Sequence, residues 1–198
     1  MRLISQLIDW ELKRSAFITR ILESPLRFQL AGAVLDLRLD RVDQLTDGRL
    51  VVLDYKTGTP KKFDGLADRL PQPQLPAYAL ASGERSAAVV TLYVGRDGIK
   101  ARGLQDQRGR IPYLASPKEG ELAWPQRMER WRQQLELLVT EYLQGDAGLR
   151  PLPDACKYCH LHALCRIDPA TLAALDTDPD AIDGEDPDSE SESDEEAE

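Results

Sequence analysis

The chain has 198 residues, of which 42% are hydrophobic and 30% are charged, so it can bury the core of one domain with a short appendage. No apolar run approaches the roughly 18 residues of a membrane helix, and charged residues between Asp9 and Arg14 interrupt any signal-peptide core. This pattern argues against a membrane protein, and we expect a cytoplasmic one.

The net charge of −9 arises at the C-terminal end of the chain. Residues 176–198 contain 13 acidic residues and no lysine or arginine, which leaves 21 acidic against 25 basic residues, a net charge of +4, in the rest. This segment has too few apolar residues to offset the entropy cost of folding. We therefore expect residues 171–198 to be a disordered acidic tail. Such a tail either keeps the protein soluble or mimics DNA and competes for a basic groove.

The first half of the chain predicts one helix followed by two strands. Residues 3–23 space their apolar positions as an amphipathic helix does, and Pro25 lies at or just beyond its end. Residues 33–43 alternate apolar and polar side chains, which indicates a half-buried strand. After a turn sequence at 46–48, residues 50–56 form a continuous apolar run that is typical of a central strand.

The second half predicts a loop at 57–73, a short helix at 76–82 opened by proline, a strand at 87–95 with a hairpin partner at 99–105, and a long helix at 125–144. The buried side of the long helix should contain Met128, Trp131, Leu135, Leu138, Val139 and Tyr142. This order of elements predicts a single α/β domain built around a central mixed β-sheet and flanked by helices.

An acid and a lysine stand together near the end of the central apolar strand. Asp54 and Lys56 are two residues apart, so on a strand they point to the same face. If 46–48 is a three-residue loop with its glycine in the left-handed conformation, the hairpin register places Asp40 opposite Asp54. Asp43 then faces the other side of the sheet, and a slip of one residue would exchange the two aspartates.

Two adjacent carboxylates repel each other unless a cation lies between them. Oxygen ligands favour Mg²⁺ or Mn²⁺, and a metal there could polarise a phosphate and lower the pKa of a bound water. Lys56 could then orient or deprotonate that water, or stabilise developing negative charge. The hairpin could therefore hydrolyse phosphodiesters, although an ordinary surface hairpin with an Asp–Lys ion pair would have the same spacing.

The stretch CKYCHLHALC contains all three cysteines, Cys156, Cys159 and Cys165, and both histidines, His160 and His162. It fits c-type haem attachment, a zinc site with three thiolates and one histidine, three ligands of an iron–sulfur cluster, or three unligated thiols. Haem attachment is the weakest of these, because it gives Cys165 no role and normally requires export.

Asp40 followed by Asp54, Tyr55 and Lys56 resembles the PD-(D/E)XK nuclease motif, in the version found in RecB- and AddB-type helicase–nucleases. Gln74 and Tyr78, in the sequence QLPAY, resemble the Q-x3-Y motif of those domains, which begins a helix beside the active site and helps to position DNA. The resemblance implies that Asp40, Asp54 and the Tyr55 carbonyl bind Mg²⁺ or Mn²⁺. It also makes Lys56 the catalytic lysine and places helices on both sides of the sheet.

AddB-type nucleases carry C-x2-C-x5-C after the nuclease core, where it holds a [4Fe–4S] cluster together with a fourth cysteine upstream. Cys156, Cys159 and Cys165 match this spacing and position, but no cysteine precedes them and no histidine precedes His160. The resemblance therefore implies the C-terminal part of a longer protein, in which the fourth cluster ligand and a helicase-like region lie upstream.

These observations predict a nuclease core at 1–150, an iron–sulfur segment at 151–170 and an acidic tail at 171–198. The expected function is that of a metal-dependent DNA nuclease, acting on single-stranded DNA as an exonuclease in double-strand-break repair and recombination beside a helicase. Two alternatives remain open: a non-catalytic DNA-binding scaffold of the same fold, and a zinc-binding interaction module.

Overall fold

The structure, a computed structural model, describes residues 2–65, 67–118, 121–151, 156, 159–168 and 170. It divides into two compact units, Met1–Ala147 and Gly148–Glu198. The first unit contains the sheet and three helices, and the cysteine stretch belongs to the second. The acidic tail predicted for 171–198 lies outside the described residues.

The first unit is built around a five-stranded sheet in the order β1-β2-β3-β4-β5. The strands are β1 (Phe17–Leu30), β2 (Ala33–Leu45), β3 (Leu50–Lys56), β4 (Ser86–Gly95) and β5 (Gly98–Gln105). The helices are α1 (Arg2–Leu12), α2 (Gln74–Ala81) and α3 (Trp124–Leu143). β3 and β4 run parallel and the other neighbours antiparallel, so the sheet is mixed and β3 is central, as the sequence predicts.

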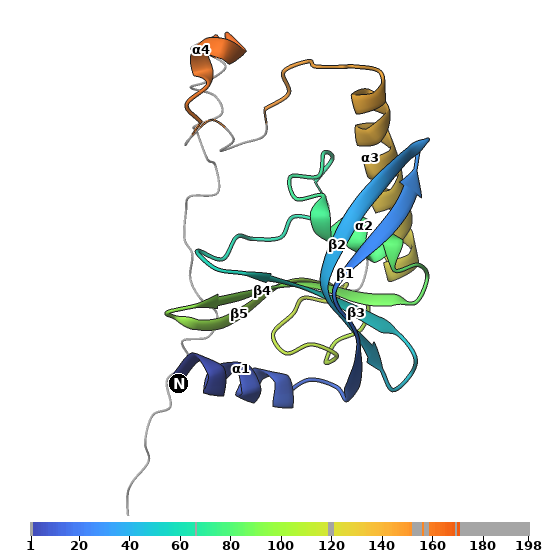
Figure 1. The fold of residues 1–198 in the computed structure, drawn as a ribbon, viewed down its shortest axis with the longest axis vertical. Coiled ribbons are helices and arrows are strands. Elements are labelled where there is room, and N and C mark those ends of the chain that lie inside the picture. Colours follow the sequence, from blue (N-terminus) through green and yellow to red (C-terminus); the bar gives the residue numbers. More distant parts are fainter. Residues whose placement is uncertain are drawn as a thin grey trace, which may run out of the picture. The chain divides into compact units, whose positions relative to one another are not determined.

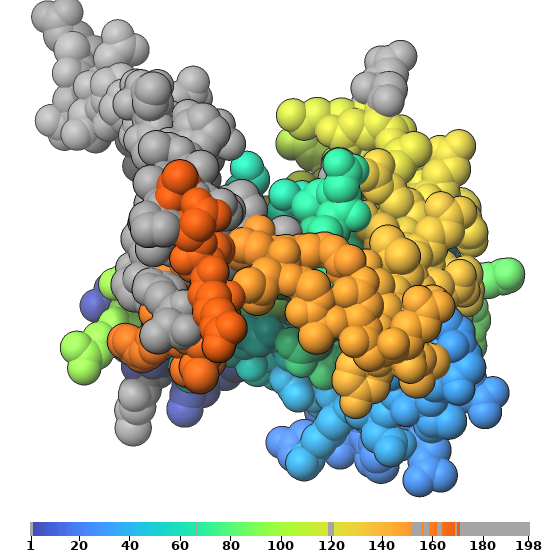
Figure 2. Space-filling model, turned by 90° about the horizontal axis from the view of Figure 1, so that it is seen from above, coloured from blue at the N-terminus to red at the C-terminus, as the bar shows by residue number. Residues whose placement is uncertain are grey.

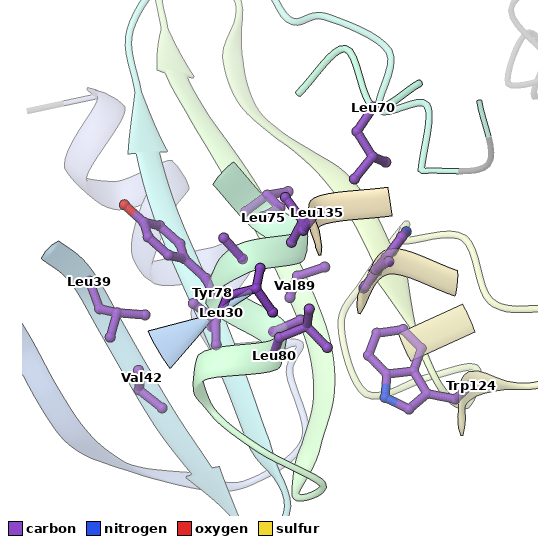
Figure 3. Close-up of a cluster of buried hydrophobic side chains, with 14 residues drawn as sticks. Leu30, Leu39, Val42, Leu70, Leu75, Tyr78, Leu80, Val89, Trp124 and Leu135 are labelled. Carbon is purple, nitrogen blue, oxygen red and sulfur yellow. The ribbon is translucent and has the colours of Figure 1, made fainter. Parts of the chain in front are cut away.

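Helices cover both faces of this sheet (Figure 1). Val51 and Leu53 of β3 pack in a core with Trp10 of α1, whereas Val52 packs on the opposite face with residues of α2 and α3. Figure 3 shows part of this second core, where Tyr78 and Leu135 gather around the sheet. The alternation along β3 thus confirms the predicted sheet flanked by helices, which is the restriction-endonuclease-like arrangement.

The predicted helix at 3–23 is wrong beyond Leu12, because Phe17 begins the long strand β1. The sequence FITRI is rich in β-branched and aromatic residues, and pairing with β2 overrides the helical spacing. Pro25 lies inside β1, opposite Arg38. Because β1 is the edge strand, a proline there need not remove a ladder hydrogen bond.

Two further expectations about helices need correction. α2 begins at Gln74 rather than at Pro76, and the proline lies in its first turn, where the helix needs no N–H donor. Tyr142 of α3 is exposed, not buried, although Met128, Leu138 and Val139 pack against the core as expected. Figure 2 shows α3, in gold, side by side with the blue β1–β2 hairpin on one face of the first unit.

The register of the β2–β3 hairpin agrees with the sequence prediction. Arg41 pairs with Leu53 and Asp43 with Val51. The Leu45 N–H donates to the Arg49 carbonyl, and Gly48 has a φ of +82°, so 46–48 is a three-residue loop with left-handed glycine. No helix in the described part of the chain is long and apolar enough to span a membrane.

Candidate active site

Asp40 and Asp54 stand side by side at the end of the β2–β3 ladder. The last paired residues are Arg41 and Leu53, and the next position on each strand holds one of the two aspartates. The Asp40 carboxylate accepts a hydrogen bond of 2.8 Å from the Tyr55 N–H, which anchors it to the central strand. Asp54 is only 3% exposed and Asp40 is partly buried, so the pair is not a fully exposed surface feature.

Burial raises the pKa of Asp54, and the neighbouring Asp40 charge raises it further, while Lys56 works in the opposite direction. The Lys56 Nζ lies 3.0 Å from Oδ2 of Asp54, in an ion pair. Oδ2 is buried, and its contact among the described residues is this ion pair with Lys56. The site therefore favours the approach of a further cation to Oδ2.

Gln74, the first residue of α2, connects the acid to the lysine. Its Nε2 donates to Oδ1 of Asp54 at 3.0 Å, and its Oε1 accepts from Nζ of Lys56 at 2.9 Å. Because a lysine ammonium only donates hydrogen bonds, the amide oxygen must face Lys56 and the amide nitrogen must face Asp54. Gln74 thus fixes the relative position of two groups from the neighbouring strand.

Tyr78 supports Gln74 from one helical turn further along α2. Gln74 Nε2 donates to the Tyr78 hydroxyl at 2.8 Å, and that hydroxyl donates to the Arg38 carbonyl at 2.7 Å. The ring of Tyr78 lies in the core while its oxygen points away from the helix (Figure 3). The structure therefore brings together five predicted residues, namely Asp40, Asp54, Lys56, Gln74 and Tyr78.

The donors at this site fit a hard divalent cation. Two adjacent carboxylates, one of them buried and ion-paired with Lys56, are the chemistry that Mg²⁺ or Mn²⁺ favours. Among the described residues, no three Asp, Glu, His or Cys side chains come close enough to form a complete metal site. Asp40 and Asp54 would thus supply two ligands, with the Tyr55 carbonyl as a candidate third, and water or substrate oxygens would complete the shell.

Asp43 points to the opposite face, as the register predicts. It is fully buried and accepts from Arg14 Nη2 at 2.7 Å, Arg41 Nε at 2.8 Å and Thr19 Oγ1 at 2.9 Å. Arg41 also donates to the Tyr55 hydroxyl at 2.9 Å, on the face of β3 opposite Asp54. Sequence reasoning missed this network, whose one signal was an arginine between two aspartates in the sequence LDRVD.

In the second unit the three cysteines form no disulfide with one another, and they line one pocket of about 260 Å³ with Pro151 and Ile167. The Leu161 N–H donates to the Cys159 sulfur at 3.4 Å. Within the described residues the cysteines do not form a group tight enough to hold a metal. The side chain of His162 lies outside the described part, so the choice between iron–sulfur and zinc stays a prediction.

Comparison with known proteins places this chain in a family. Residues 2–166 match the PD-(D/E)XK nuclease superfamily, while no curated protein matches the chain. Among solved structures, the crystal structure of SSO0001 is 18% identical, covers 84% of this chain and 68% of its own, and has a TM-score of 0.41. The match is to the superfamily as a whole, so the resemblance to RecB- and AddB-type nucleases stays a prediction.

Proposed function

This chain belongs to the PD-(D/E)XK nuclease superfamily, and from that premise we propose that it is a metal-dependent deoxyribonuclease. Its reaction is the hydrolysis of a phosphodiester bond at Asp40, Asp54 and Lys56. In the finer form of the proposal, Mg²⁺ is the metal and single-stranded DNA is the substrate. The resemblance to RecB- and AddB-type nucleases further suggests exonuclease action beside a helicase in double-strand-break repair.

The roles of the residues follow from their contacts. Asp40 and Asp54 would hold Mg²⁺, which supplies a Lewis acid for the phosphate and a more acidic bound water. Asp54 must lose its proton for this, and burial raises its pKa, so acid pH should oppose metal binding. Lys56, whose side chain is 42% exposed, can reach a substrate phosphate or the attacking water. Gln74 holds the ammonium beside the carboxylate.

One observation carries this proposal: Asp54 is buried, forms an ion pair with Lys56, and accepts a hydrogen bond from Gln74 on a separate helix. An ordinary surface ion pair would leave both charges in water, where the pair contributes little stability. Burying a carboxylate next to a second one is costly, and such costs are typical of functional sites. The same observation disfavours the inert-hairpin and scaffold alternatives.

A cleavage assay on end-labelled single-stranded and duplex DNA, with Mg²⁺, Mn²⁺ or EDTA, tests the proposal. Asp54→Ala and Lys56→Ala should each lower the rate by ~10²-fold or more, because each removes a charge at the reacting phosphate. Asp54→Ala should also weaken Mg²⁺ binding, whereas Lys56→Ala should not. The matched control is Asp36→Ala, which removes an exposed aspartate on the same strand as Asp40 and should cleave normally.

Wild-type cleavage in either active-site variant would overturn the assignment. A wild-type protein that binds DNA but does not cleave it in either Mg²⁺ or Mn²⁺ would favour the scaffold instead. The length of the products and their dependence on a labelled 5′ or 3′ end separate exonuclease from endonuclease action.

A further inference from the structure

The face of the sheet that carries the active site continues onto β4 and β5. In the strand registers Lys56 pairs with Tyr93, and Tyr93 pairs with Lys100. Asp54 pairs with Thr91, which in turn pairs with Arg102. Because paired residues on neighbouring strands share one face, Lys100 and Arg102 lie on the same face as the catalytic pair, two strands away.

A groove opens at this end of the sheet, beside Lys56. It has a volume of about 430 Å³ and lies between the loop at 57–60 and the β4–β5 turn at 95–98, with Lys100 in its wall. In Figure 1 the loop after β3 and the β4–β5 turn lie together at the ends of these strands, on the left of the sheet. Arg96, in that turn, also lines the groove. The lining of the groove thus begins at Thr57, directly after the predicted catalytic residue Lys56.

The cations of this groove are exposed and unneutralised. Arg96 and Lys100 line the groove, and Arg102 lies beyond it, on the same face of β5 as Lys100. All three are exposed, and within the described part of the chain none of them forms an ion pair. Elsewhere in the first unit arginines are commonly neutralised; the ion-paired ones are Arg14, Arg27, Arg38, Arg41, Arg49, Arg69, Arg110, Arg127, Arg130 and Arg132. One acid, Asp97, lies among the groove residues. The surplus positive charge is complementary to an anionic ligand.

We propose that this groove binds the sugar–phosphate backbone of a single nucleic-acid strand that leads to or from the reacting phosphate. The proposal rests on the proposed function, which places a phosphate at Asp54 and Lys56. Two strand spacings separate Lys56 from Lys100, about 10 Å, so the two cations can contact different phosphates of one backbone. One row of cations follows one backbone.

The groove offers no platform for bases. Its aromatic residue, Tyr93, is only 6% exposed, so bases cannot stack on its ring. Stacking and base-edge contacts are what give sequence preference, whereas phosphate contacts position a strand without reading it. Binding by this groove is therefore sequence-tolerant and strongly salt-dependent.

Fluorescence anisotropy of a labelled single-stranded oligonucleotide, with the full chain in EDTA, tests the groove without cleavage. Arg96→Ala/Lys100→Ala should weaken binding by ~10-fold at low salt, and the slope of log affinity against log salt should fall by about 1.4, or 0.7 per phosphate contact. The control, Lys13→Ala/Arg108→Ala, removes the same two positive charges from the opposite side of the sheet. There the loop at 106–118 packs against the core that contains Trp10 of α1. Arg96→Lys/Lys100→Arg should restore binding.

Equal affinities for the groove variant and the control would overturn the groove. A duplex of the same sequence that binds as tightly, with the same loss in the variant, would overturn the assignment to a single strand. Cleavage is scored separately. If the wild type cleaves DNA and the groove variant binds normally, the groove proposal is wrong and the nuclease proposal is supported. If the wild type cleaves no DNA but the groove variant loses binding, the nuclease proposal is wrong and the groove proposal is supported.

Discussion

Asp54 is the residue at which stability and function oppose each other. Burial raises its pKa above the ordinary value of 3.8, so in the metal-free fold the protonated carboxyl is favoured. The stability from that protonation is fully present below pH 3.8, and it is lost as the pH rises through the raised folded value. At neutral pH the ionised Asp54 therefore costs stability, which a bound cation would offset.

This cost gives a pH-dependent prediction. Asp54→Asn cannot ionise, so in EDTA it should be more stable than the wild type at pH 7, and the difference should shrink as the pH falls toward 3.8. Added Mg²⁺ should stabilise the wild type more than the variant, because it binds the folded state through Asp54. Denaturant unfolding at several pH values, with and without Mg²⁺, measures both effects. A variant less stable than the wild type in EDTA at neutral pH would contradict it.

Gln74 gives a second prediction at this scale. Gln74→Ala removes the contacts that hold Lys56 and Asp54 together and leaves the Tyr78 hydroxyl with one partner fewer. Cleavage should fall by ~10-fold or more, since a misplaced catalytic group loses much of its effect, while stability should fall by only about 1 kcal/mol. The control is Gln72→Ala, two residues earlier on the exposed loop. Cleavage rates and unfolding curves of both variants settle the comparison.

How far the sequence predicts the site depends on the range of the contacts. Asp40, Asp54 and Lys56 could be placed together because a three-residue turn fixes the hairpin register locally. Gln74 was placed beside them only by its resemblance to a nuclease motif, since spacing does not reveal which strand end a helix meets. Their catalytic roles stay predictions until cleavage is measured.

At the scale of elements, contacts that form only in the folded chain explain what sequence reasoning missed. The helix predicted at 3–23 is correct only as far as Leu12. From Phe17 onward, pairing with β2 determines the conformation. The buried network joins Arg14, which precedes β1, to Arg41 and Asp43 of β2, so its one local signal in the sequence is the LDRVD stretch. The predicted strands at 87–95 and 99–105 agree with β4 and β5 to within one residue at each end.

The same network makes Asp43 a structural residue. Asp43→Ala should leave Arg14 and Arg41 buried without their shared carboxylate, and such losses destabilise by roughly 3–5 kcal/mol. Asp40→Ala should instead cost little stability and abolish cleavage. Thermal unfolding and cleavage rates of the two variants distinguish the roles. If Asp43→Ala unfolds like the wild type but is inactive, the assignment of the two faces is wrong.

The cysteine segment carries a prediction of its own. By resemblance, Cys156, Cys159 and Cys165 supply three of the four cysteines that a [4Fe–4S] cluster uses, so this chain should hold less than one cluster per molecule after anaerobic reconstitution. Each Cys→Ala change should abolish the iron that is bound, and His160→Ala should not. Iron, sulfide and zinc analysis provides the measurement. One zinc per chain, released by His160→Ala, would establish the zinc site instead.

At the scale of the whole molecule, charge is divided along the chain. The residues before 176 carry a net charge of +4, while 176–198 contain 13 acids and no base. A net negative protein would repel DNA at long range, although its first unit presents unpaired cations beside the candidate site. The affinity for nucleic acid should therefore depend on whether the basic residues before 176 or the acidic residues after it dominate the electrostatic potential.

Removing residues 176–198 changes the net charge from −9 to +4 without touching the sheet or its helices. Because neutralisation of phosphates dominates nucleic-acid affinity and salt screens charges beyond about 10 Å at 0.1 M, the truncated protein should bind single-stranded DNA more tightly at low salt. The gain should fade as salt is added. Unfolding temperatures of both forms should agree, which separates a charge effect from a change in fold. Equal affinities at low salt would show that the acidic residues do not compete with DNA and act only on solubility.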